Sequence, residues 1–274
     1  AWRVGGLRCA SRLRACIPAS PRARRLPGGV YTITGGLGGL GLRAAVLLID
    51  GGAARLILGS RSGQVVRDGQ GLEAQLRSLG AVAAVAFCGS ADACQASTLR
   101  GVAPPAGGLN TAGSYAKGLL VALDALRIGR MNAPKAVGAC LLQHASSAIP
   151  LETRLLFSSV SAGLGNVGLA DYASTNACLD SRASSRRSHG EVACSLQWPA
   201  VQGAGMGAAG LAAMRDRRVT IAGLMDISLE EYVACLEAQL ATGIGAAMGV
   251  QLTHQADTRK LLNDLADASQ PRFG

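Results

Sequence analysis

GVYTITGGLGGLGLRAAVLLIDGGAARLILGSR, residues 29–61, begins and ends with a short apolar run. Between the two runs lie a glycine-rich turn and a segment with helical spacing. Residues 30–34 are rich in β-branched side chains and predict a strand, whereas residues 40–49 have the apolar spacing of a helix. Residues 55–59 predict a second strand. The order strand, glycine turn, helix, strand is a βαβ unit, in which the two strands lie parallel.

The glycines of this turn indicate a dinucleotide site. Gly35, Gly39 and Gly41 would let backbone N–H groups approach a pyrophosphate at the helix N-terminus, where the helix dipole favours an anion. The alternative is a glycine-rich turn that binds no ligand. Ser60 and Arg61 stand where a carboxylate would accept the ribose hydroxyls of NAD, and an arginine suits the 2′-phosphate of NADP. The alternative for Arg61 is a solvated surface side chain.

The rest of the chain continues the alternation of strands and helices. Because Pro104 and Pro105 cannot lie inside a central strand, we expect the fourth strand to be short or irregular. The strands expected after the first two lie at 82–87, around 100–103, 154–157, 192–197 and 248–252. The expected helices lie at 68–80, 118–128, 136–142, from Tyr172 towards Arg187, and at 229–240. This pattern predicts the α/β class, with a Rossmann-like, doubly wound parallel sheet covered by helices on both faces.

Composition excludes several classes of protein. The chain is 49 % hydrophobic but only 3 % aromatic, so its core must be built mainly from aliphatic side chains. The net charge of +10 is concentrated in residues 1–27, which hold seven arginines and no acid and leave about +3 for the remainder. That remainder has no basic stripe interleaved with aromatics, which argues against nucleic acid as a partner. No apolar run is long enough to span a membrane.

The eight cysteines include no CxxC pair, so we expect neither a metal site nor a disulfide framework. Residues 1–28 are expected to be a basic, disordered arm or linker, followed by one domain at 29–256 and a tail at 257–274. An arginine-rich, acid-free start is also typical of an organellar transit peptide, and a remnant of a longer polypeptide is a third reading. We therefore expect a cytoplasmic protein, or a plastid or mitochondrial one if residues 1–27 are a transit peptide.

A second stretch, FSSVSAGLGNVGLADYASTNACLD at 157–180, carries the candidate catalytic residues. An apolar strand ends in hydroxyls that include Ser159, and a helical segment then places Tyr172 and Asn176 on one face. A phenol that donates a proton near neutral pH needs a cation nearby. Lys135 is the one lysine between positions 117 and 260. The alternative is that the serine and tyrosine have only structural roles.

These segments resemble the catalytic half of the ketoreductase domains of modular polyketide synthases, a branch of the short-chain dehydrogenase/reductases. The matching pieces are TGGLGGLG at 34–41, GSRSG at 59–63, Lys135 fifteen residues after GLL, and the 155–180 block. Most short-chain reductases place a lysine four residues after the tyrosine. This chain has Asn176 there and its lysine upstream, which is the arrangement of the ketoreductase branch.

The resemblance implies that NADPH reduces a β-ketoacyl thioester, bound to an acyl carrier protein through phosphopantetheine, to a β-hydroxyacyl thioester. Tyr172 would donate the proton, Ser159 would bind the carbonyl oxygen, and Lys135 and Asn176 would complete the site. The residues expected to contact the cofactor are Gly35, Leu37, Gly38, Gly39, Leu40, Gly41, Ser60, Arg61 and Gly113. Other polyketide synthase domains are further expected partners.

Several positions depart from the family pattern. Gly89 replaces an aspartate beside the adenine, LNTAG at 109–113 replaces HAAG, and residues 197–200 read QWPA instead of NWGP. The family's stereochemical markers are absent at 115–117 and at Leu164. Two alternatives to the carrier-protein ketoreductase are therefore kept: another short-chain reductase acting on fatty-acyl or small ketone substrates, and a catalytically silent structural or docking remnant.

Overall fold

The central feature of the computed structural model is a seven-stranded sheet in the order β10-β8-β7-β6-β3-β4-β5, in which every pairing is parallel. The structure describes residues 2–4, 7–9, 26–65, 70–89, 91–92, 105–114, 116, 118–165, 168–206, 224–241, 250–251 and 254–255. The sheet strands are β3 Val30–Thr34, β4 Arg55–Ser60, β5 Ala83–Phe87, β6 Pro105–Asn110, β7 Thr153–Ser159, β8 Cys194–Trp198 and β10 Val250–Gln251. The prediction of a doubly wound parallel sheet is confirmed.

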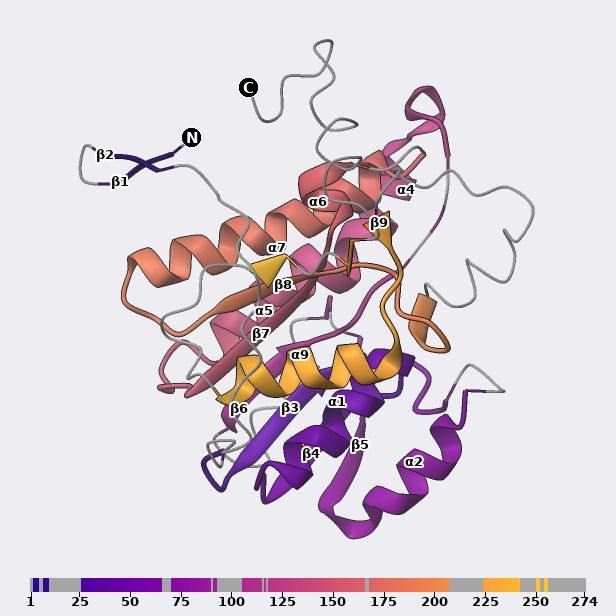
Figure 1. Ribbon diagram of the computed structural model, residues 1–274, viewed down its shortest axis with the longest axis vertical. Coiled ribbons are helices and arrows are strands. Elements are labelled where there is room, and N and C mark those ends of the chain that lie inside the picture. Colours follow the sequence, from indigo (N-terminus) through magenta and orange to yellow (C-terminus); the bar gives the residue numbers. More distant parts are fainter. Residues whose placement is uncertain are drawn as a thin grey trace.

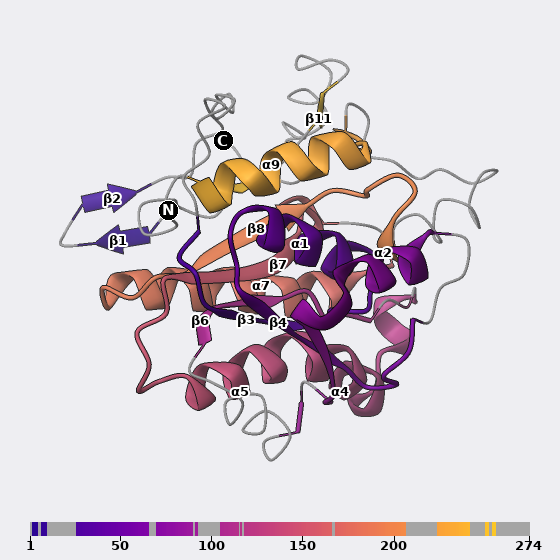
Figure 2. The same cartoon turned by 90° about the horizontal axis from the view of Figure 1, so that it is seen from below.

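Helices cover both faces of this sheet. They are α1 Gly39–Asp50, α2 Leu72–Leu79, α4 Ala125–Asn132, α5 Gly138–Ala145, α6 Ser161–Leu164, α7 Ala170–Ser188 and α9 Leu229–Ala241. Short helical turns lie at η1 Gly80–Val82, η2 Leu120–Ala122 and η3 Ala133–Val137. Figure 1 shows the order along the chain, and Figure 2 shows α1 and α9 on one side of the sheet with α4 and α5 on the other.

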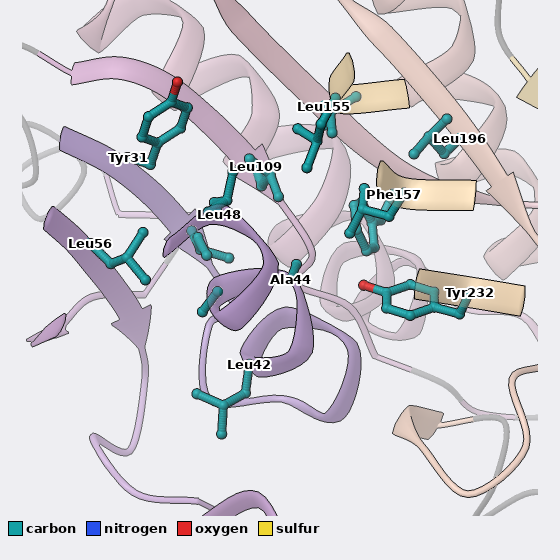
Figure 3. Close-up of a cluster of buried hydrophobic side chains, with 14 of the residues drawn as sticks. Tyr31, Leu42, Ala44, Leu48, Leu56, Leu109, Leu155, Phe157, Leu196 and Tyr232 are labelled. Atoms are coloured by element: carbon teal, nitrogen blue, oxygen red, sulfur yellow. The ribbon is translucent and has the colours of Figure 1, made fainter. Parts of the chain in front are cut away.

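Alternating side chains along the strands fill the two layers. One face contributes Tyr31, Ile33, Leu109, Leu155 and others to the large core under α1 and α9 (Figure 3). The opposite face contributes Leu156, which packs with buried residues of α5 and α7. This period of two is what a strand covered on both sides requires.

The fourth strand of the main sheet along the described chain lies later than the expected position. The strand β6 begins at Pro105 and occupies the centre of the sheet between β3 and β7, and it is irregular at its start. Proline is tolerated there because it is the first strand residue, and the register shifts between the pairs Val30–Pro105 and Tyr31–Gly107. The expected strand at 100–103 lies outside the described residues.

The helix expected at 118–128 begins later than predicted. Residues 120–122 form a separate turn, and α4 starts after Asp124, whose carboxylate accepts a hydrogen bond of 2.7 Å from the Arg127 N–H. This N-cap satisfies a helix-terminal donor, so the helix begins there and not at Gly118. It continues through the π-type turn η3, which contains Pro134, into α5. The helix predicted at 136–142 thus starts in the last residues of η3 and lies mostly in α5.

Two small two-stranded sheets lie outside the main sheet. Strands β1 Trp2–Val4 and β2 Leu7–Cys9 pair antiparallel inside the expected arm, and β9 Leu224–Met225 pairs antiparallel with β11 His254–Gln255. Leu26, also expected to belong to the arm, is buried in the core and its N–H donates to the Gly51 carbonyl at 2.8 Å.

Candidate active site

A cleft of about 500 Å³ opens at the carboxyl ends of β3, β4 and β6. The chain passes from β3 to β4 and β5 on one side of β3, and then crosses back to β6 on the other side. Doubly wound sheets bind ligands at such a reversal of strand order. The residues expected to contact the cofactor, Gly35, Leu37, Gly38, Gly39, Leu40, Gly41, Ser60, Arg61 and Gly113, all line this cleft.

The glycine loop is built from positions where a side chain would not fit. Gly35 has φ of +70°, and a Cβ there would lie 2.6 Å from the Ala112 backbone. A Cβ at Gly41 would lie 2.5 Å from the Gly35 carbonyl oxygen, and one at Gly39 would lie 2.3 Å from the Gly205 nitrogen. Gly38 forms the N-cap of α1 without a side-chain hydrogen bond, so the first N–H groups of this helix are left for an anion.

Arg61 follows β4 and is exposed on the rim of the cleft. Neither of the ion pairs in the described part of the chain involves it. Its guanidinium is therefore available to a phosphate group, as the sequence predicts for an NADP-type cofactor.

The four candidate catalytic residues come from three different elements of the fold. Lys135 lies in the π-type turn η3, Ser159 is the last residue of β7, and Tyr172 and Asn176 lie on the first turns of α7. The Lys135 Nζ is 5.8 Å from the centroid of the Tyr172 ring. The structure thus brings the upstream lysine to the tyrosine, as the ketoreductase arrangement requires.

The hydrogen bonds of Ser159 and Asn176 leave specific groups unused. Ser159 Oγ accepts from the Ser161 N–H at 3.3 Å and from the Ser161 hydroxyl at 3.0 Å, so its own proton can be donated elsewhere. Asn176 Nδ2 donates to the Tyr172 carbonyl at 2.7 Å, and its Oδ1 is buried without a donor in the described residues. Ser158 Oγ donates to the Asn176 carbonyl and so ties α7 to the strand end.

Lys135 is buried, with 3 % of its surface exposed. Its Nζ donates to the Phe157 backbone carbonyl, and the Asn110 side chain donates to the Lys135 carbonyl at 3.4 Å. Burial lowers the pKa of Lys135 from its ordinary 10.5 to about 7, because the ammonium loses its hydration. Opposing this, the negative charge of Asp180 raises the pKa of Lys135.

Gly113 joins the catalytic residues to the cleft. A Cβ at this position would lie 3.0 Å from Lys135 Cε and 3.1 Å from Met206 Cε, so the lysine stem passes directly beside the cleft wall. Pro134, the neighbour of Lys135, also lines the cleft. A ligand that fills the cleft as far as Gly113 would therefore reach Lys135.

Sequence reasoning missed several residues that line the cleft: Gly59, Ser62, Gln64, Leu72, Cys88, Thr111, Ala112, Pro134, Gly205 and Met206. Thr111 and Ala112 could have been found, because they directly follow a central strand next to the glycine loop. Gly205 and Met206 carry no local pattern that places them there. Their position depends on the return of the chain after β8 to the glycine loop.

Two expectations concern absent features. Within the described ranges, no group of His, Cys, Asp and Glu side chains is arranged to hold a metal ion. Across the same residues, none of the helices combines the length and the apolar character that a membrane crossing needs. Of the positions expected to mark stereochemistry, residues 115 and 117 and the side chain of Leu164 lie outside the described part of the chain.

Comparisons with known proteins agree with this geometry. The sequence model of the KR domain matches residues 29–203. The spectinabilin polyketide synthase system protein NorB of Streptomyces orinoci is 37 % identical over 225 residues, which cover 78 % of this chain and 10 % of that protein.

Solved structures show the same likeness. An A-type ketoreductase from a modular polyketide synthase superposes with a TM-score of 0.80 at 28 % identity, over 94 % of this chain and 55 % of that one. The Streptomyces ketoreductase from the first module of phoslactomycin biosynthesis gives a TM-score of 0.74 at 29 % identity, over 92 % of this chain and 59 % of that one.

The chain spans about a tenth of the length of that curated relative and somewhat more than half of these solved ketoreductases. The matched region includes the glycine loop, Lys135, Ser159, Tyr172 and Asn176. The chain belongs to the KR, or ketoreductase, domain family of polyketide synthases, within the short-chain dehydrogenase/reductase fold.

Proposed function

We propose that this chain catalyses the NADPH-dependent reduction of a β-ketoacyl thioester on an acyl carrier protein to the β-hydroxyacyl thioester. One observation carries the proposal: Lys135 lies beside the Tyr172 ring and, at Gly113, against the wall of the dinucleotide cleft. A proton donor, a cation and a cofactor site therefore meet at one place, which is what carbonyl reduction requires.

The cofactor supplies a hydride to the carbonyl carbon, and the protein supplies the proton and stabilises the charge. As negative charge develops on the carbonyl oxygen, the Ser159 hydroxyl donates a hydrogen bond to it. The Tyr172 hydroxyl would give its proton to the same oxygen, which together with the hydride on the carbon would complete the alcohol. The Lys135 ammonium stabilises the resulting phenolate, and the unused Asn176 Oδ1 is an acceptor next to these groups.

The glycine loop and Arg61 support the choice of NADPH. The N-terminus of α1, which has no side-chain cap, suits the pyrophosphate. Arg61 is exposed on the rim of the cleft and pairs with no acid in the described residues, which suits the 2′-phosphate. The carrier-protein partner is proposed because the relatives that the chain matches are parts of multidomain polyketide synthases. The domain is proposed to cover residues 29–256, with Leu26 added to its core.

The test compares NADPH oxidation with a small β-ketoacyl thioester in the wild type and in Tyr172→Phe. The reaction is monitored as the loss of NADPH absorbance. We expect turnover in the wild type and a loss of about 100-fold or more in the variant, since general acid catalysis is typically worth 10²–10⁴. Cofactor affinity, measured by NADPH fluorescence titration, should be nearly unchanged. Comparable turnover in both proteins would contradict the role of Tyr172, and no NADPH binding by the wild type would favour a silent remnant.

A further inference from the structure

The helix that carries Tyr172 and Asn176 presents a third polar residue, Asp180, at the next position of the same spacing. Asp180 Oδ1 accepts a hydrogen bond of 2.5 Å from the Ser195 hydroxyl, and its Oδ2 accepts one of 2.6 Å from Gln197 Nε2. The two donors alternate along β8 and therefore lie on the same face of that strand. The carboxylate is thus fixed between α7 and β8, with a donor on each oxygen.

Lys135 needs a negative charge nearby, because the hydrogen-bond acceptor of its Nζ is a neutral backbone carbonyl. A buried ammonium without a counter-charge loses its proton readily. The sheet register brings Asp180 close to the lysine. Phe157, whose carbonyl accepts the hydrogen bond from Lys135 Nζ, pairs with Leu196 of β8, which lies between the Ser195 and Gln197 that hold the Asp180 carboxylate. The negative charge of Asp180 therefore acts on Lys135 and opposes the effect of burial.

The other groups that face Lys135 do not supply this charge. α7 also carries Asp171, but its carboxylate is paired with Arg127 of α4 at 2.8 Å. β7 contributes the Phe157 carbonyl, and α5 carries no acid but has His144 in its last turn. From the same helix as Asp180, Tyr172 presents its ring to the ammonium.

We propose that Asp180 is a positioning residue, a fixed negative charge that keeps Lys135 in its ammonium form beside Tyr172. Its catalytic consequence rests on the proposed function, because a neutral lysine would not stabilise the Tyr172 phenolate. The charge relation itself does not depend on turnover and can be measured directly.

The direct test is a ¹³C NMR titration of the protein labelled at lysine Cε. The chain has lysines only at 117, 135 and 260, so the Lys135 signal can be assigned with Lys135→Arg. We expect Asp180→Asn, which keeps the shape of the side chain, to lower the titration midpoint of Lys135 by about 1 pH unit or more, the usual effect of a nearby opposite charge. An unchanged midpoint would overturn the proposal.

Two further variants serve as a charge control and as a substitute for a variant that does not fold. Asp124→Asn removes the same charge from an exposed helix cap, where asparagine caps equally well, and should leave the midpoint unchanged. Should Asp180→Asn fail to fold, Asp180→Ser removes the charge with a smaller side chain and should lower the midpoint in the same way. A midpoint that falls equally in Asp124→Asn would mean that net charge, not Asp180, sets it.

The kinetic test follows kcat against pH with the β-ketoacyl thioester. In Asp180→Asn the alkaline limb should move to lower pH by the same amount as the NMR midpoint, and the KM for NADPH should change little. An active wild type whose limb stays in place in the variant would overturn the proposal. An inactive wild type with a shifted NMR midpoint would instead overturn the proposed function and leave the charge relation standing.

Discussion

Replacing Lys135 by methionine should abolish turnover and stabilise the fold, by an amount that depends on pH. The side chain is buried, and burial lowers its pKa from 10.5 to about 7. The unfolded chain therefore holds the proton up to about pH 10.5, whereas the folded protein releases it near pH 7. Stability of the wild type falls as pH is lowered through this window, and the full penalty is present below it.

The magnitude follows from the difference between the two pKa values. At about 1.4 kcal/mol for each pKa unit, the penalty approaches 5 kcal/mol in mild acid and falls to below about 1 kcal/mol near pH 10. Methionine has a similar length and no titrating group. The variant gives up the hydrogen bond to the Phe157 carbonyl, worth about 1 kcal/mol, whereas the effect of the Asp180 charge on the ammonium is already contained in the lowered pKa. The stability gained by the variant should therefore be about 4 kcal/mol larger at pH 6 than at pH 10.

The assay is urea unfolding of the wild type and Lys135→Met at several pH values, with the free energy of unfolding compared pair by pair. Since other titrating groups are common to both proteins, their contributions cancel in the difference. A difference that does not change between pH 6 and pH 10 would refute the reasoning. It would mean that water reaches the amine and that Lys135 titrates in its ordinary range.

Three further predictions concern other parts of the molecule. Arg61→Ala should weaken NADPH binding by about 10-fold or more and NADH binding far less, because a charge-assisted hydrogen bond is worth roughly 1.5–3 kcal/mol. Equal weakening of both cofactors in fluorescence titrations would mean that Arg61 does not bind the 2′-phosphate. Gly107→Ala should lower the urea midpoint, because its Cβ would lie 2.6 Å from the Tyr31 ring. Gly108→Ala should instead raise stability by about 0.4–1 kcal/mol, because its Cβ would meet only the Thr32 carbonyl oxygen, at an ordinary contact distance of 3.9 Å. Equal effects at the two glycines would contradict this contrast. Arg127→Ala should lower the free energy of unfolding by about 3 kcal/mol in the same assay, because it leaves the Asp171 carboxylate, which is 1 % exposed, without its cation. An unchanged urea midpoint would show that water replaces the guanidinium.

The local parts of the site could be predicted from the sequence. Tyr172 and Asn176 are four residues apart on a helix, so their shared face follows from helical geometry alone. The glycine loop follows from its position between a strand and a helix. Lys135 is different, because its approach to Tyr172 depends on a π-type turn that no periodicity indicates.

Tertiary packing decides what local patterns could not. Asp180 reads as an ordinary helix residue until β8 places Ser195 and Gln197 against it. Pro105 reads as a strand breaker, yet its missing N–H is harmless at the first position of a central strand. The start of α4 could have been predicted from Asp124, which is a typical N-cap residue. It was missed because the apolar residues before it also fit a helical pattern.

The βαβ unit at the start of the domain is held by residues that are synthesised much later. The Tyr232 hydroxyl of α9 donates to the Leu40 carbonyl at 2.9 Å, across a sequence separation of 192 residues, and Figure 3 shows this ring directed towards α1. Gly205 donates to Gln70 across a separation of 135 residues. A nascent chain leaving the ribosome would thus contain the whole glycine loop long before the contacts that support it exist. Competence to bind the cofactor should appear late in translation, once α9 has emerged, and C-terminal truncation before Tyr232 should remove it.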